Sequence, residues 1–348
     1  MTTPKLPQTN WLALDVGGAN IKAAHSRGEA RSRPFQLWKQ PEHLPGILKN
    51  LVSTLPPFDN LALTMTAELC DCYANKAEGV TAIVESALSL TAPENIHVWG
   101  TDGDFHTVPS ILAQPAQAAA ANWLALATLA ARFAAKGSGI LIDIGSTTTD
   151  LIPLVNQKPS PQGRTDTERL RSGELIYAGV RRTPVCALGH EVVWRGAPTG
   201  LCAELFATTH DVYLTTGDCD PDPSDHQTAD GRPATVQAAR DRLARMVGAD
   251  RETFSTADAN ELAGTLDSML LDRLILAGQR VLGSNTPCSA VISGSGQFLA
   301  RRVARGILPP EAPIIDLAAV WGPRASDAAC AQALLILAAE TIPLSMRT

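Results

Sequence analysis

Short apolar runs that end in glycine turns are the clearest pattern in the chain. The first run begins at Trp11 and ends in Asp15-Val16-Gly17-Gly18-Ala19-Asn20, and an extended pattern resumes at Ile21. The second run covers residues 139–142 and ends in Asp143-Ile144-Gly145-Ser146-Thr147-Thr148-Thr149-Asp150, followed by another apolar run. An apolar run of this length bounded by turn residues is typical of a buried strand. The pattern predicts two strand–turn–strand units, each with an aspartate where its first strand ends.

Repetition of one unit predicts two related α/β lobes with a cleft between them. The length of 348 residues agrees with two domains of ~150 residues each. We expect lobes at 1–136 and 137–348, with the C-terminal helix packing back on the first. The apolar stretches 116–135 and 328–339 predict buried helices, since one is interrupted by polar residues and the other is too short to span a bilayer. Residues 29–46 predict an irregular connection.

A third glycine turn lies near the C-terminal end of the chain. Gly294-Ser295-Gly296 follows the apolar run 289–293 and precedes a helical pattern from Gln297 to Arg305. It is an incomplete dinucleotide fingerprint, because Leu299 stands where the third glycine belongs. There is no G-x-x-x-x-G-K-[ST] motif, which excludes a P-loop protein. A strand, a glycine turn and a helix could still cover a nucleotide base or ribose.

The two aspartate turns have the parts of a phosphate clamp. Glycine lets backbone N–H groups approach an anion closely, and the Ser and Thr hydroxyls of the second turn add donors. A carboxylate at the end of a buried strand needs a nearby cation, which a phosphate-bound magnesium ion supplies, usually through water. Lys22 adds positive charge for the same phosphates. The alternative is a pair of ordinary hairpins with Asp and Gly turn residues. The predicted phosphate- or nucleotide-binding residues are Gly17, Gly18, Asn20, Gly145, Ser146, Thr147, Thr148, Gly294, Ser295 and Gly296, with Asp15 and Asp143 as magnesium ligands.

Composition narrows the class of protein. Apolar residues make up 45% and charged residues 18%, so the chain can build a core and is not disordered. The net charge of −6 argues against a nucleic-acid partner. The start of the chain has no signal-peptide pattern, and we expect no membrane partner. An odd number of cysteines without framework spacing predicts a reduced, cytoplasmic protein.

A polar cluster after the apolar run 61–63 is a further candidate site. Thr66 and Glu68 follow this predicted strand, and a strand's C-terminal end is the usual place for a ligand in an open α/β sheet. Glu68 could act as a base or hold an amine. The alternative is a helix start with Thr66 as its N-cap. Cys70 and Cys72 lack two further ligands at zinc-site spacing, which favours free thiols.

Two segments in the second half mix acids, aromatics and arginines. Residues 173–184 carry Tyr177, Arg181 and Arg182, where arginine suits diphosphate or carboxylate oxygens and the tyrosine could stack on a flat ring. The alternative is a solvated surface hairpin. Residues 217–233 hold five aspartates and three prolines, which predicts a loop. That loop is either a lid or binding loop or a solvated turn cluster, and a helix at 235–247 follows it.

The three glycine turns resemble the motifs of the sugar kinase, Hsp70 and actin (ASKHA) superfamily. The first two turns are similar to its two phosphate motifs, and residues 291–296 are similar to its adenosine motif. The helical stretches 116–135 and 328–339 look like its connecting helices. The resemblance implies a two-lobed actin-like, ribonuclease H-like α/β fold with a central cleft.

A narrower resemblance rests on residues 15–22, 64–69, 143–150 and 228–232. Together they are similar to the hydantoinase/oxoprolinase-like branch, some of whose members are labelled tetrahydromethanopterin-linked C1 transfer pathway proteins. Archaeal members are taken to join an aminomethylfuran diphosphate to γ-glutamyltyramine in methanofuran biosynthesis; the bacterial counterpart is methylofuran. Here residues 19–22 replace the Thr and Asp ending of the longer hydantoinases, which argues against amide-ring hydrolysis. The substrate candidates are Thr66, Tyr177, Arg181 and Arg182, which the resemblance supports, together with Asp230 and Arg232, which it adds.

The expectation is a magnesium-dependent transferase acting on a small diphosphate-bearing substrate. The clamp holds the diphosphate, and Glu68 or Asp150 takes the proton of the attacking phenol; Asp225 and Asp230 stay open as alternatives. The predicted catalytic residues are Asp15, Lys22, Glu68, Asp143 and Asp150. One alternative function is an ATP-dependent kinase, ligase or hydrolase on the same residues, and another is a non-catalytic nucleotide-binding protein. A homodimer is left open.

Overall fold

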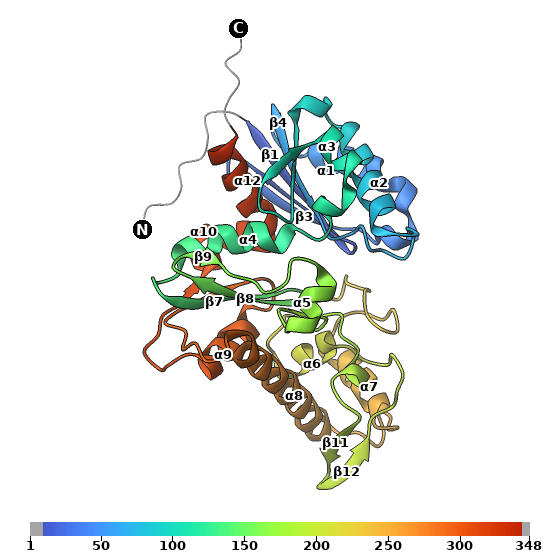
Figure 1. Ribbon diagram of the computed structural model, residues 1–348. Helices are drawn as coiled ribbons and strands as arrows, with labels where there is room; N and C mark the ends of the chain where they lie inside the picture. Colours follow the sequence, from blue (N-terminus) through green and yellow to red (C-terminus); the bar gives the residue numbers. More distant parts are fainter. Residues whose placement is uncertain (1–9, 343–348) are drawn as a thin grey trace. The chain divides into compact units, whose positions relative to one another are not determined.

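The computed structural model describes residues 10–342, which form a mixed α/β protein (Figure 1). The strands are β1 Trp11–Val16, β2 Asn20–His25, β3 Ala30–Pro34, β4 Asn60–Met65, β5 Ile96–Trp99, β6 Phe105–Thr107, β7 Ser138–Ile144, β8 Thr149–Val155, β9 Lys158–Pro159, β10 Leu175–Ile176, β11 Glu191–Trp194, β12 Ala197–Gly200, β13 Ala290–Ser293 and β14 Ile314–Asp316. The helices are α1 Leu44–Val52, α2 Lys76–Leu88, α3 Val108–Ala113, α4 Asn122–Ala130, α5 Asp166–Ser172, α6 Thr209–Thr216, α7 Val236–Met246, α8 Thr256–Leu282, α9 Gln297–Ile307, α10 Leu317–Trp321, α11 Pro323–Asp327 and α12 Ala329–Thr341.

Two sheets share one topology. The first has the strand order β3-β2-β1-β4-β5-β6, and the second has the order β10-β8-β7-β13-β14 with β9 beside β8. In each sheet the first strand, β1 or β7, has its hairpin partner on one side. On its other side lies a strand that comes much later in the chain, β4 or β13. The mixed α/β class is confirmed, and the two strand–turn–strand units predicted from the apolar pattern are present as β1–β2 and β7–β8.

The chain divides into two compact units, and each combines separate segments. Among the described residues, the first unit contains 10–141, 152–172 and 315–342, and the second contains 142–151 and 173–314. Helix α12 therefore belongs to the first unit, where it packs against β1, β2 and α4. The limits 1–136 and 137–348 stay a prediction.

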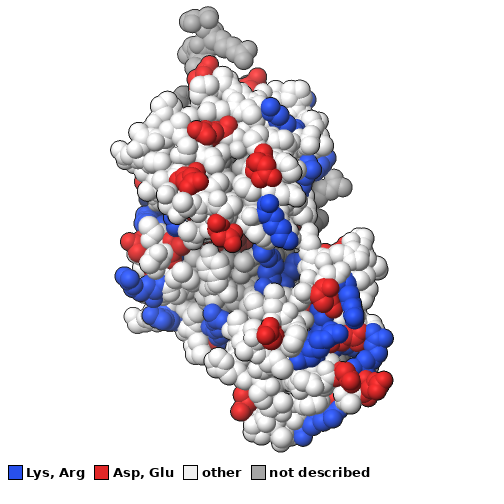
Figure 2. Space-filling model, turned by 90° about the vertical axis from the view of Figure 1, so that its right-hand side faces the viewer, with Lys and Arg blue, Asp and Glu red and all other residues white. Residues whose placement is uncertain are grey.

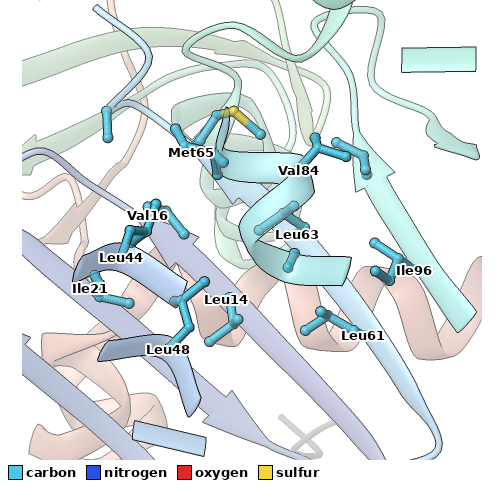
Figure 3. Close-up of a cluster of buried hydrophobic side chains, with 14 of the residues drawn as sticks. Leu14, Val16, Ile21, Leu44, Leu48, Leu61, Leu63, Met65, Val84 and Ile96 are labelled. Carbon is cyan, nitrogen blue, oxygen red and sulfur yellow. The ribbon is translucent and has the colours of Figure 1, made fainter. Parts of the chain in front are cut away.

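The core of the first unit explains why β1 and β4 are apolar almost throughout. Their residues are buried on both faces of the sheet, as is usual for parallel neighbours covered by helices. Helices α1, α2 and α3 cover one face and α12 covers the other (Figure 1). Figure 3 shows Leu14, Leu63 and Leu48 meeting on the first of these faces. The strand ends, where Asp15 and Thr64 lie, are therefore held by a rigid core.

Two of the predicted segments, 116–135 and 29–46, differ from the structure in where their helices and strands begin. The stretch 116–135 is not one helix, because the chain turns at Ala120, whose φ of +50° is outside the helical region, and α4 starts only at Asn122. Residues 29–46 are not all irregular, since β3 pairs with β2 and α1 starts at Leu44. Within residues 10–342, no helix is long and apolar enough to cross a membrane.

Candidate functional site

The first glycine turn is closed by its own backbone. The Gly17 N–H donates to the Asn20 carbonyl at 3.0 Å, and a Cβ at Gly17 would lie 2.8 Å from that oxygen. A Cβ at Gly18 would lie 2.7 Å from the Cys70 sulfur. Gly17 needs glycine because a side chain there would meet the backbone of the turn, whereas a side chain at Gly18 would displace the Cys70 side chain. The turn is therefore preformed, and Asn20 contributes its backbone to closing it.

Asp15 lies near the end of β1, next to the first glycine turn, and each of the two neighbouring strands places a polar residue opposite it. It is opposite Lys22 on β2 and opposite Thr64 on β4, so the three side chains share one face of the sheet. The Asn122 side chain donates to Asp15 Oδ1 at 3.2 Å. Burial raises the pKa of the Asp15 carboxyl, while Lys22 and Asn122 lower it. A buried carboxyl with this environment is a candidate ligand for a cation or a donor.

Glu68 lies beyond the end of β4 and is fully buried. Neither of its carboxylate oxygens accepts a hydrogen bond of normal geometry from a described residue. Burial raises its pKa to about 7, and the backbone amides of Glu68 and Ala120 and the charge of Lys76 act in the opposite direction. A carboxyl that titrates near neutral pH is suited to general acid–base work.

The helix that follows Glu68 begins later in the chain than the N-cap alternative predicts. Helix α2 begins at Lys76, and Asn75 caps it by accepting from the Glu78 N–H at 3.0 Å. The alternative of a helix start with Thr66 as N-cap is therefore wrong; Thr66 is exposed in the turn after β4. Lys76 forms an ion pair with Asp166 at 3.4 Å.

The second glycine turn, in the second unit, is held by a neighbouring segment. The Gly145 N–H donates to the Thr148 carbonyl at 2.9 Å, and the Ser146 carbonyl accepts from the Arg181 and Arg182 amides at 3.1 and 2.8 Å. A Cβ at Gly179 would lie 2.6 Å from the Thr147 nitrogen. Residues 178–182 thus form a floor on which this turn rests.

The third glycine turn lies against the end of β7, also in the second unit. The Gly296 N–H donates to the Ile144 carbonyl at 2.8 Å. Gly294 has a φ of +89°, and a Cβ there would lie 2.7 Å from Asp143 Oδ1. Two segments that are far apart in the sequence thus meet at Asp143. The binding role of both segments stays a prediction.

The other predicted substrate residues are placed differently from one another. Tyr177 and Arg182 are exposed. Arg181 is partly buried and pairs with Asp225 of the loop at 217–233. Asp150 lies in β8 opposite Leu175 of β10, and no observation tests it as a base.

Asp230 and Arg232 belong to a network of ion pairs. Asp230 accepts from Arg242 at 2.9 Å, and Arg242 is fully buried and also pairs with Asp211 at 2.7 Å. Arg232 lies 3.7 Å from Asp230. Figure 2 shows acidic and basic side chains closely interleaved in the lower part of the view. This network ties the loop to α6 and α7, which gives Asp230 a structural role that sequence reasoning missed.

Among residues 10–342, no group of three or more His, Cys, Asp or Glu side chains could hold a metal by itself. Cys70 and Cys72 are free and pack against the core of the first unit. A cavity of about 360 Å³ lies between α7 and the start of α8 and is lined by Arg240, Asp241 and Arg251 among others. It contains none of the predicted site residues.

Sequence reasoning missed the residues that support the turns. Asn122 holds Asp15, and its signal was a polar residue at the start of an Ala-rich helix. Gly179 and Thr209 support the second turn, since the Thr209 hydroxyl donates to the Gly179 carbonyl at 2.7 Å. Gly179 and Thr209 carry no such local signal, because only the fold brings them to the turn.

The fold and these buried polar residues define an α/β protein with glycine turns at the ends of its strands. The hydantoinase/oxoprolinase family model matches residues 59–320, and the chain belongs to this family. A Methanocaldococcus jannaschii protein named (4-{4-[2-(gamma-L-glutamylamino)ethyl]phenoxymethyl}furan-2-yl)methanamine synthase is 35% identical over 265 residues, which cover 75% of this chain and 78% of that protein. A Methanococcus vannielii protein of the same name is 31% identical over 158 residues, covering 45% of this chain and 71% of that protein.

Solved structures match most of the chain at low identity and with TM-scores below 0.5. An archaeal actin homologue in complex with ADP has a TM-score of 0.48 at 15% identity, covering 95% of this chain and 99% of that chain. A ROK family glucokinase from Streptomyces griseus with glucose and AMPPNP has a TM-score of 0.45 at 14% identity, covering 94% and 98%. At this level the likeness says nothing about the ligand of this protein.

Proposed function

We propose that this protein is a transferase of methanofuran-type or methylofuran-type cofactor biosynthesis. It would join an aminomethylfuran diphosphate to a γ-glutamyltyramine-like phenol and release diphosphate. The observation that carries the proposal is the 35% identity, over most of both chains, to a synthase named for such a product. That name describes a phenoxymethyl ether, which is the bond that a phenol forms with an activated furan methylene.

The proposed step is a substitution at the methylene carbon. The phenol oxygen forms the new C–O bond, the bond from the methylene to the diphosphate oxygen breaks, and the phenol proton passes to a protein base. Glu68 suits the base, because its pKa of about 7 leaves part of the population ionised and able to accept a proton near neutral pH. Diphosphate leaves with the bonding electron pair, so neutralising its charge lowers the barrier.

The glycine turns would serve the diphosphate in this proposal. Gly18 in the first unit and residues 146–148 in the second would offer backbone amides, whereas the Gly17 and Gly145 amides already donate within their own turns. Lys22 adds charge beside Asp15. Magnesium, when bound, would neutralise charge on the leaving group. Single carboxylates such as Asp15 and Asp143 fit this ion, since Mg²⁺ is usually held by one or two carboxylates together with substrate phosphates and water.

A coupled assay of furan diphosphate, γ-glutamyltyramine and magnesium tests the proposal. We expect ether product and diphosphate in equal amounts with no requirement for ATP. Asp15→Asn and Asp143→Asn should each lower turnover by about two orders of magnitude or more. Full turnover in either variant would remove that residue from the mechanism, and absence of product from the wild type would overturn the proposal.

An ATP-dependent kinase or ligase is the second candidate, favoured by the packing of the Gly294 turn against Asp143. The same assay separates the two, because this candidate requires ATP and forms ADP or AMP. A product that depends on ATP would replace the transferase proposal.

A further inference from the structure

Arg181 connects the second glycine turn to the loop at 217–233. Its backbone N–H donates to the Ser146 carbonyl in the turn, while its side chain pairs with the Asp225 carboxylate in the loop. The Arg181 side chain is 36% exposed and that of Asp225 is 13% exposed. The Arg181 backbone thus rests on the turn, while its partly exposed guanidinium reaches the loop and pairs there with Asp225.

A buried histidine beside Arg181 has unused hydrogen-bonding capacity. His210 is 6% exposed, and its Nδ1 has no hydrogen-bond partner among the described residues. Burial, together with the charges of Arg181 and Arg242, lowers its pKa to about 4, so the ring is neutral at pH 7. A buried polar atom without a partner costs free energy unless a ligand or water satisfies it.

Arg242 shows what a purely structural arginine looks like in the same region. It is fully buried and is held by two carboxylates, those of Asp211 and Asp230. Arg181 differs, because its side chain is partly exposed and the ion pair that the structure gives it is with Asp225 alone, while Asp222 adds only a nearby negative charge. A loop carboxylate can be exchanged for a ligand carboxylate without loss of the ion pair.

We propose that Arg181 recognises a carboxylate on the acceptor substrate and that Asp225 occupies this position until the acceptor binds. The inference rests on the proposed function, in which the acceptor carries a γ-glutamyl group. That group has a free carboxylate, whereas tyramine alone has none. The planar guanidinium suits a carboxylate through two parallel hydrogen bonds, and Asp225 shows that a carboxylate fits against it. His210, on which the charge of Arg181 acts, adds a buried Nδ1 without a hydrogen-bond partner near this position.

Exchange of one carboxylate for another predicts opposite effects of two variants. Arg181→Gln removes the recognition group and should weaken binding of the acceptor. Asp225→Asn removes the competing carboxylate and should strengthen it. Arg181→Gln also leaves the Asp225 carboxylate partly buried without its arginine, so the double variant Arg181→Gln/Asp225→Asn guards against a folding defect. Asp220→Asn is the matched control, since Asp220 is exposed on the same loop.

Isothermal titration calorimetry with γ-glutamyltyramine and with tyramine tests the inference. We expect the wild type to bind γ-glutamyltyramine at least tenfold more tightly than tyramine, and both Arg181→Gln variants to lose this difference. Asp225→Asn should bind γ-glutamyltyramine severalfold more tightly with tyramine unchanged, and Asp220→Asn should match the wild type. Equal binding of the two compounds by the wild type, or an undiminished difference in the folded Arg181→Gln variants, would overturn the inference.

The synthase assay keeps this result separate from the proposed function. Wild-type discrimination in binding without ether formation would reject the proposed reaction and leave the carboxylate site standing. Ether formation by a wild type that binds γ-glutamyltyramine and tyramine equally would support the proposed reaction and reject the carboxylate site. If Arg181→Gln raised the KM for the furan diphosphate and left that for the acceptor unchanged, Arg181 would be a phosphate ligand and the inference would be wrong.

Discussion

At the scale of single residues, the molecule buries two carboxyls at the ends of adjacent parallel strands. Asp15 and Glu68 are both buried, and burial raises the pKa of each. Burial of a carboxylate is unfavourable unless partners compensate for the lost hydration. Such a cost in stability is typical of residues retained for function.

Replacement of Glu68 by Gln should remove a pH dependence of stability. The pKa of Glu68 rises from 4.5 to about 7 on folding, so the folded state binds more protons than the unfolded state between these values. The stability from this group is therefore present below pH 4.5 and is lost as pH rises through 7, by about 3 kcal/mol. Urea unfolding at pH 5 and pH 8 should show a smaller decrease in Glu68→Gln than in the wild type.

Glu85 is an exposed carboxyl on α2, in the same unit as Glu68, and Glu85→Gln is therefore the control. Glu85→Gln should follow the wild-type pH dependence, since an exposed carboxyl keeps its hydration on folding. If Glu68→Gln also followed it, Glu68 would not titrate near neutral pH in the folded protein.

Replacement of Lys22 by Met should affect the diphosphate substrate selectively. Lys22 lies across from Asp15 and lowers the pKa of that carboxyl. Loss of its charge should raise the KM for the furan diphosphate by about tenfold, which corresponds to about 1.4 kcal/mol, with the KM for the phenol unchanged. Steady-state kinetics with each substrate varied in turn is the measurement. A change confined to the phenol would show that Lys22 does not serve the phosphates.

At the scale of elements, the second glycine turn depends on the segment beneath it. A Cβ at Gly179 would overlap the turn, lying 2.6 Å from the Thr147 nitrogen and 2.7 Å from the Ser146 carbonyl carbon. Gly179→Ala should therefore displace the turn, lower the free energy of unfolding by about 1–3 kcal/mol, and weaken binding of pyrophosphate. Chemical denaturation and calorimetry measure the two effects.

Gly264→Ala is the matched control for this substitution. Gly264 lies inside α8 with open space around the position of a Cβ. Alanine there should stabilise the protein by roughly 0.5–1 kcal/mol, because glycine is unfavourable in a helix interior. Equal effects of the two substitutions would show that the floor formed by residues 178–182 does not shape the turn.

The elements show how far sequence reasoning reaches. The strands around Asp15 and Asp143 and the helix after Gly296 were predictable, because each has a local apolar period and a turn signal. Helix α8, the longest element, was not anticipated; its signal was the capping box of Ser255 and Asp258. The break at Ala120 and the tie of Asp230 to Arg242 had no local signal, since both depend on tertiary contacts.

At the scale of the whole molecule, a bound ligand should raise the Tm of the protein, and the compound that raises it most identifies the class of ligand. A ligand that binds only the folded state stabilises it by about 2.7 kcal/mol at a hundredfold excess over its dissociation constant. We expect pyrophosphate with magnesium to raise the Tm, because the transferase must hold a diphosphate, and ATP to raise it less. Thermal unfolding with magnesium and each compound, followed by intrinsic fluorescence, is the measurement.

The variants already described make this shift specific to the glycine turns. Asp15→Asn and Asp143→Asn should each reduce the shift, because in the proposed function each carboxylate helps to hold the metal and the diphosphate. A general effect of salt would persist in both variants, and potassium sulfate at equal ionic strength would reproduce it. A larger shift with ATP or ADP than with pyrophosphate would favour the kinase or ligase. No shift with any compound would remove the phosphate clamp itself, and the buried carboxyls of Asp15 and Glu68 would then need another ligand.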